Sequence, residues 1–173
     1  MNTELFYYGL LQLGLSILLS VFVLYFTFSR VTRFFKRKHN FTFDNVAFAI
    51  FISGVIFSVG YLFEGINQPI LMVIRFLKAD PHFKGAVFFE AGKYVGLFLV
   101  IGLVFALSVS AIAVYFFTIL TRLIDEFEEL KNGNVAVGII LAAVIITVSF
   151  ICRDSLVSIL EAFIPYPASP NIQ

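Results

Sequence analysis

The sequence predicts an all-α membrane protein of four transmembrane helices, arranged as two parallel-repeat helical hairpins with both termini outside. Three observations lead to this fold class: the composition, the length of the apolar stretches and an internal repeat. Of the 173 residues, 60% are hydrophobic and 13% are charged, whereas a soluble domain is roughly 45–50% apolar and about 25% charged. A water-soluble surface needs more charge than this chain has, so the bilayer is the expected solvent for most of it.

Four stretches are long enough to cross the hydrocarbon core, which takes about 20 apolar residues in a helix. They are Leu5–Ser29, Val46–Ile66, Tyr94–Leu120 and Val135–Ile159. We expect the first to be a span and not a cleaved signal peptide, because no basic residue precedes it and no small-residue cleavage site follows it.

The placement of lysine and arginine predicts the orientation of the spans, because cytoplasmic loops carry an excess of both. Five basic residues follow the first span within residues 30–38, and none precedes it. This contrast places the first loop in the cytoplasm and both termini outside. Against it, the outer loop of residues 67–93 also holds four lysine or arginine residues.

The two longer connections predict different structures. In the outer loop, the apolar stretch Ile70–Lys78 with its basic pair is typical of a helix lying at the membrane interface. In the inner connection, apolar residues at helical spacing alternate with acidic residues over Leu123–Leu130. We therefore expect the third span to continue into the cytoplasm as an amphipathic helix.

An internal repeat divides the chain into a first hairpin in residues 1–66 and a second hairpin in residues 94–173. A shift of 89 residues aligns them without gaps, so that Asn-Val-Ala at 45–47 falls on Asn-Val-Ala at 134–136. Small residues of the second span also coincide with small residues of the fourth. Both halves run out-to-in and then in-to-out, so they are parallel repeats about an axis along the membrane normal.

These repeated hairpins carry a resemblance to a known family. Their shared segments, DNVAFAIFISGVIFSVGY and GNVAVGIILAAVIITVSF, resemble the YjfL-like family of bacterial inner-membrane proteins, the domain of unknown function numbered three hundred and fifty. The resemblance covers nearly the whole chain and implies a four-span protein of the bacterial inner (cytoplasmic) membrane. Family members are often encoded near polyamine-related enzymes and membrane-stress proteins of the phage-shock type, which implies a context and not an activity. No catalytic or ligand residues are assigned in the family, so none are carried over.

Asparagine begins both the second and the fourth span. Asn45 and Asn134 are predicted N-caps, in which the side-chain oxygen accepts from a free backbone N–H of the first turn. A polar ring at the mouth of a pathway is the alternative. Above them, small residues share one helix face in each half, which predicts a packing seam between the two spans or, alternatively, a substrate groove. The predicted seam consists of Ala49, Ser53, Gly60, Gly138, Ala142 and Ser149.

Charged residues near the outer ends of the second and fourth spans are the first candidates for function, because charges within spans are rare and usually functional. Glu64 and Arg153 are equivalent under the 89-residue shift, and we predict an intramembrane ion pair, within one chain or between two. The alternative is that both are solvated ends that reach outward. Asp154 and Glu161, seven residues apart, are predicted to line an outer acidic vestibule or else to be solvated ends.

The basic residues after the first span are expected to mark topology and to face anionic lipid headgroups. This set consists of Arg33, Lys36, Arg37 and Lys38. The alternative, on the same electrostatic grounds, is that they bind a protein partner in the cytoplasm.

No catalytic, phosphate-binding or metal-binding motif occurs, and no Cys/His cluster is present. We therefore expect no enzyme, no metal and no cofactor, and a net charge of +1 gives no basic excess for nucleic acid. The first hypothesis is a non-catalytic membrane component, a scaffold or sensor in a bacterial envelope or membrane-stress system, present as a homo-oligomer or as a subunit of a membrane complex. The alternative is an oligomeric channel or transporter for cations or polyamines.

Overall fold

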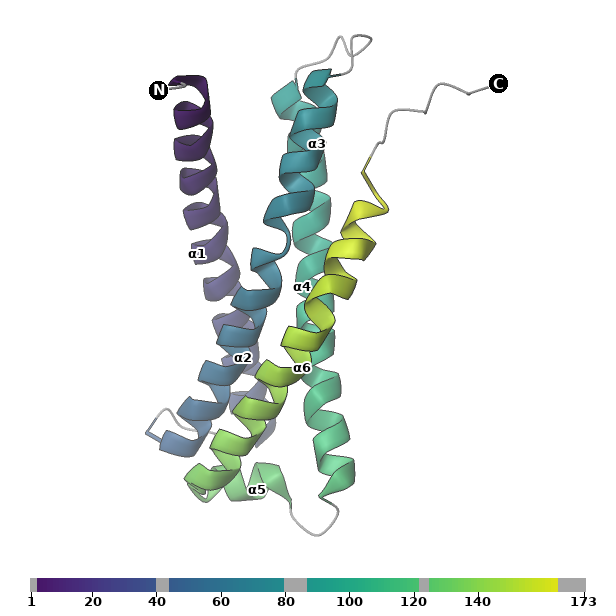
Figure 1. Cartoon of the computed structure of the whole chain (residues 1–173). Helices are drawn as coiled ribbons and strands as arrows, with labels where there is room; N and C mark the ends of the chain where they lie inside the picture. Colours follow the sequence, from purple (N-terminus) through teal and green to yellow (C-terminus); the bar gives the residue numbers. More distant parts are fainter. Residues whose placement is uncertain (1–2, 40–43, 80–86, 122–124, 165–173) are drawn as a thin grey trace, which may run out of the picture.

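The structure, a computed structural model, describes residues 3–39, 44–79, 87–121 and 125–164. It is a bundle of helices (Figure 1), in chain order α1 (Thr3–His39), α2 (Val46–Glu64), α3 (Asn67–Ala79), α4 (Val87–Leu120), α5 (Glu126–Lys131) and α6 (Val135–Glu161). Four of the described segments are long and apolar enough to cross a membrane, namely Ser16–Phe35, Val46–Lys78, Phe89–Ile119 and Val135–Glu161. The predicted all-α fold with four long apolar helices is therefore confirmed.

The central helix of the bundle is α2, which packs against α1, α4, α5 and α6. Its side chains are apolar on nearly every side, as expected for a helix that other helices or lipid surround. The largest of its contacts is with α6, which runs in the same direction along the bundle (Figure 1). Its core side chains include Phe48, Phe51, Val55, Val59 and Leu62.

The basic segment that was predicted to be the first loop is helical. The predicted end of the first helix, at Ser29, is therefore wrong. Helix α1 continues to His39, because residues 30–39 contain no glycine or proline that would end it. Phe35 on this part of α1 packs against Phe48, with ring centroids 5.8 Å apart, and against Phe127, with centroids 5.7 Å apart. The last turns of α1 are therefore held beside the bundle.

The expected interfacial segment is helical, and it runs along the bundle rather than across its end. Only Gly65 and Ile66 separate α3 from α2, and α3 continues upward beside α4 (Figure 1). Ile70 and Val73 on α3 are buried in the core. Burial of these residues against α4 explains why the segment follows the bundle.

The third span does not continue as one amphipathic helix, contrary to the prediction for Leu123–Leu130. Helix α4 ends at Leu120, residues 122–124 lie outside the described part of the chain, and α5 is a separate short helix. The physical reason is Asp125, whose carboxylate accepts from the N–H groups of Phe127 and Glu128 and so begins a new helix.

Candidate functional site

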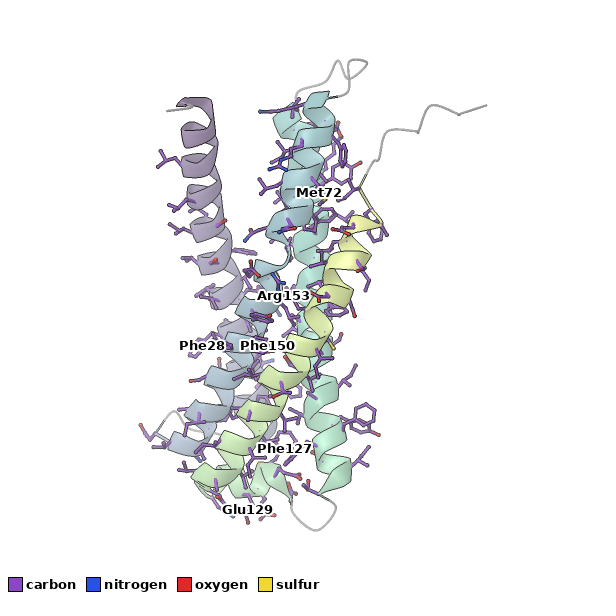
Figure 2. All side chains as sticks on the ribbon, viewed as in Figure 1. Phe28, Met72, Phe127, Glu129, Phe150 and Arg153 are labelled. Atoms are coloured by element: carbon purple, nitrogen blue, oxygen red, sulfur yellow. The ribbon has the colours of Figure 1, made fainter. Side chains whose placement is uncertain are left out.

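The structure brings Glu64 and Arg153 together as an ion pair between α2 and α6. Arg153 Nη2 donates a hydrogen bond to Glu64 Oε2, across 89 residues of sequence. Glu64 is the last residue of α2. In Figure 2, Arg153 lies near the mid-height of the bundle, at the level where α2 gives way to α3. The pair therefore joins the two helices at the point where α2 ends.

An aromatic ring and a second carboxylate also lie beside the Arg153 guanidinium. Its Cζ atom lies 5.4 Å from the centroid of the Tyr61 ring, which is a cation–π distance. The Tyr61 ring packs on Phe150 with centroids 4.0 Å apart, and Asp154 Oδ1 is 3.7 Å from Arg153 Nη1. Sequence reasoning missed Tyr61 and Phe150, although they too are 89 residues apart and the same shift identifies them.

The Glu64–Arg153 pair holds two helices together and neutralises its own two charges. The Arg153 side chain is 26% exposed and that of Glu64 is 60% exposed, so the guanidinium is the more enclosed partner. A carboxylate that accepts from a guanidinium is a poor ligand for a free cation, because its charge is already balanced. The role that this site supports best is structural: the ion pair fixes the register of α2 against α6.

The structure does not bring Asp154 and Glu161 into contact. The Asp154 side chain is 94% exposed, and Glu161 is half-buried as the last residue of α6. Seven residues along a helix separate them by about 10 Å. Among the described residues no hydrogen bond or ion pair joins the two, so the acidic vestibule stays a prediction.

The predicted packing seam is present on α6 and absent from the predicted face of α2. The three residues predicted on α6 are all buried: Gly138, Ala142 and Ser149. On α2, however, Ala49 and Ser53 are exposed. Gly60 has no atom within 4 Å of the place where a Cβ would stand. The prediction for these three α2 residues is therefore wrong.

A different face of α2 makes the close contact with α6. A Cβ on Gly54 would lie 2.6 Å from Ala142 Cβ, and a Cβ on Gly138 would lie 2.6 Å from the carbonyl oxygen of Ala47. Small residues allow two membrane helices to approach this closely. The physical reason for the error is that the prediction required equivalent helices to use equivalent faces.

The α2–α6 contact breaks the symmetry that the repeat predicts. Ser58 and Ser149 are hydrogen-bonded to each other in the buried interface. A twofold axis between the helices would impose the matching contact between Gly60 and Thr147. Gly60 instead faces open space and Thr147 is exposed. Since Ser58 and Gly60 are about 200° apart around a helix, α2 and α6 meet through non-equivalent faces at this level. Nearer the end of α2 the equivalent residues Tyr61 and Phe150 do meet.

Asn45 and Asn134 cap the helices that follow them. Asn45 Oδ1 accepts from the N–H of Phe48, at 3.0 Å, and Asn134 Oδ1 accepts from the N–H groups of Ala136 and Val137. Asn45 does more than cap, because its Nδ2 also donates to the carbonyls of Leu130 and Lys131, at 2.6 and 3.0 Å. This side chain therefore ties the start of α2 to the end of α5.

Replacing Asn45 with alanine should lower the free energy of unfolding by about 1–3 kcal/mol, more than Asn134→Ala. Losing a cap costs about 1 kcal/mol. Asn45→Ala also removes the two hydrogen bonds to the carbonyls of Leu130 and Lys131, whereas Asn134→Ala removes one further bond, to the Glu129 carboxylate. Unfolding by SDS titration from mixed micelles measures both variants. Equal losses would mean that the two bonds from Asn45 to the end of α5 contribute no more than the single bond from Asn134 to Glu129.

The predicted basic residues lie on the last turns of α1. Arg33 and Arg37 are exposed, and both line a cavity of about 980 Å³ together with residues of α2 and α4. Sequence reasoning did not anticipate this cavity. The side chains of Lys36 and Lys38 lie outside the described part of the chain.

Comparison with known proteins identifies one family. The model of a domain of unknown function, DUF350, matches residues 2–156 of the chain. Neither the search of curated proteins nor the search of solved structures gave a match.

Proposed function

Since this chain belongs to the DUF350 family and is a multi-pass membrane protein, we propose that it is a non-catalytic component of the bacterial inner membrane that scaffolds partners or senses the state of the envelope. The proposal includes a YjfL-like identity, an origin by tandem duplication and a cytoplasmic position for the end of the bundle that carries α5. The capping residues Asn45 and Asn134, which stand 89 residues apart, support the duplication.

The observation that carries this proposal is the state of the hydroxyl side chains on α2, α4 and α6. Ser58 and Ser149 bond to each other. Four further hydroxyls donate to a carbonyl four residues earlier in their own helix, namely those of Ser53, Ser108, Ser110 and Thr147. A pathway for ions needs polar groups that replace the ion's hydration shell. These six hydroxyls on α2, α4 and α6 are already engaged, and the buried hydroxyl of Thr27 on α1 is the exception, with no hydrogen-bond partner among the described residues. The engaged hydroxyls favour a component over a conduit.

The alternative function, an oligomeric channel or transporter for cations or polyamines, depends on acidic groups that attract the cargo. Glu64 was the deepest of the predicted acidic residues, and its carboxylate accepts from Arg153. A neutralised pair attracts cations weakly. This pairing supports the component role over transport.

The end of the bundle that carries α5 offers a charged surface to a partner. Helix α5 presents an acidic surface whose exposed members are Asp125 and Glu128. Complementary charges steer association and set specificity between proteins. This surface is where we expect a cytoplasmic partner to dock.

Flux through sealed liposomes tests the proposal against transport. We expect liposomes that contain the purified protein to pass protons, potassium and labelled spermidine no faster than protein-free liposomes, with an added ionophore as the positive control. Flux above the protein-free level that Glu64→Gln reduces would overturn the proposal and establish a pathway.

Site-directed crosslinking tests the scaffold role directly. In a Cys152→Ser background, a cysteine at exposed Glu128 should crosslink to another protein in native membranes, because this residue lies on the proposed docking surface. A cysteine at Ile139, which is 54% exposed on α6, is the matched control on an apolar surface. Identical crosslinking patterns from the two positions would count against a partner at α5.

A further inference from the structure

A groove opens between the C-terminal part of α1 and helices α2 and α4. It has a volume of about 980 Å³. Its floor is apolar, formed by side chains such as Phe51 and Val55 of α2 and Val114 of α4. Arg30, Arg33 and Arg37 of α1 line its other side, and we call this space the α1–α4 groove.

The three arginines place an unbalanced positive charge on the groove. They stand at spacings of three and four residues, so they share one face of α1. All three are exposed, and within the described residues none has a carboxylate partner. Arg30 lies 4.9 Å from the centroid of the Phe26 ring, a contact that leaves its N–H groups available to an anion. Among the described lining residues none is acidic.

These charges lie beside stretches that are apolar enough for the membrane interior. Residues 46–63 of α2 and 95–120 of α4 carry no charged side chain. Arg30 lines the same groove as Val55, and ten residues of helix place Val55 about 15 Å above Asn45. A guanidinium at membrane depth without a counter-charge is costly. An anionic ligand in the groove would remove this cost by balancing the charge of the arginines.

The shape of the groove indicates an anion with a hydrocarbon tail. A free phosphate has no apolar surface to bury against such walls, whereas an acyl chain gains free energy by covering them. Beyond the groove, the N-terminal part of α1 stands apart from α3 and α4 (Figure 1). Large apolar side chains are exposed on that part, including Leu13, Ile17, Leu18 and Val21. By helical spacing these side chains lie on another face of α1 than the three arginines, so the apolar walls of the groove itself are the surface that an acyl chain would cover.

We propose that the α1–α4 groove binds an anionic phospholipid, whose phosphate lies against Arg30, Arg33 and Arg37 and whose acyl chain covers the apolar walls. Arginine suits this role, because its planar guanidinium donates two hydrogen bonds to one phosphate. Tyr115 and Thr118 of α4 also line the groove and supply hydroxyl donors. The lipid would come from the leaflet that surrounds the C-terminal end of α1.

Native mass spectrometry of the purified full-length chain tests this site. The protein is titrated in micelles with phosphatidylglycerol, with phosphatidylcholine or with inorganic phosphate. We expect phosphatidylglycerol to be retained at least about tenfold more tightly than phosphatidylcholine, and inorganic phosphate to leave it in place. Displacement by inorganic phosphate would overturn the lipid assignment in favour of a free anion.

Two variants distinguish lipid binding in the groove from general attraction of anionic lipid to basic residues. Changing Arg30, Arg33 and Arg37 together to glutamine should abolish the preference for phosphatidylglycerol. Ala111→Trp keeps the charges and fills the groove, which Ala111 lines, so it should weaken lipid retention as well. Retention that survives Ala111→Trp would show general attraction to basic residues and overturn the proposal.

A charge-matched control completes the experiment. It changes three basic residues outside the groove to glutamine, namely Arg75, Lys78 and Lys131. This variant has the same net charge as the arginine variant and should bind phosphatidylglycerol like the unaltered chain. An equal loss in both triple variants would contradict a specific site on α1.

Discussion

Replacing Gly138 with valine should force α6 away from α2 and cost more than 3 kcal/mol of stability. A Cβ at this position would lie 2.6 Å from the carbonyl oxygen of Ala47 and 3.2 Å from its Cα. These are backbone atoms of a helix and cannot rotate away. Overpacking a close contact costs about 1–3 kcal/mol, so we expect Gly138→Ala within this range and Gly138→Val above it. The midpoint of unfolding in an SDS titration, followed by circular dichroism, measures the loss.

Gly60 is the matched control, since it is a helical glycine of α2 with open space around it. Gly60→Ala should leave the midpoint unchanged or raise it, because alanine is favoured over glycine in helices by about 0.5–1 kcal/mol. Gly60→Val should likewise find no clash. If Gly60→Val destabilised the protein as much as Gly138→Val, the helices would meet at the predicted seam and the described contact would be incorrect.

The fold class could be predicted because the bilayer fixes the length of an apolar helix, but the helix ends could not. Residues 30–38 mark a change from apolar to charged sequence, and this change predicts a loop there. Charge marks the edge of the apolar span and does not end a helix, so α1 runs on to His39. In the inner connection the opposite happened, because Asp125 begins a new helix where continuation was expected.

The residues of the candidate site could be predicted only where the 89-residue shift between the two hairpins pointed to them. Glu64 and Arg153 meet at the 89-residue offset. The same offset misplaced the α2 half of the seam, because side-chain packing decides which face of a helix meets its neighbour, and sequence equivalence does not. The α1–α4 groove lay beyond sequence reasoning altogether. Its residues come from three helices whose mutual approach depends on the shapes of buried side chains.

Reversing the charge of either Glu64 or Arg153 should destabilise the bundle by about 2–4 kcal/mol, and reversing both should recover most of the loss. Glu64→Arg places two guanidinium groups side by side, and Arg153→Glu places two carboxylates together, arrangements that cost several kcal/mol when juxtaposed. The double variant restores an ion pair in the opposite sense. SDS unfolding of the four proteins measures the coupling between the two positions.

A second double-mutant cycle with neutral variants measures the attraction between Glu64 and Arg153 without the repulsion that charge reversal introduces. Because the Glu64 side chain is 60% exposed, we place the coupling between Glu64→Gln and Arg153→Gln at about 1 kcal/mol, the upper end for exposed pairs. Asp154→Asn is the control, since Asp154 is 94% exposed at 3.7 Å from the guanidinium, and it should change little. Zero coupling in both the neutral and the reversed cycles would mean that the two charges are independent solvated ends. Coupling in both would mean that the ion pair, and not its aromatic neighbours alone, sets the register of α2 against α6.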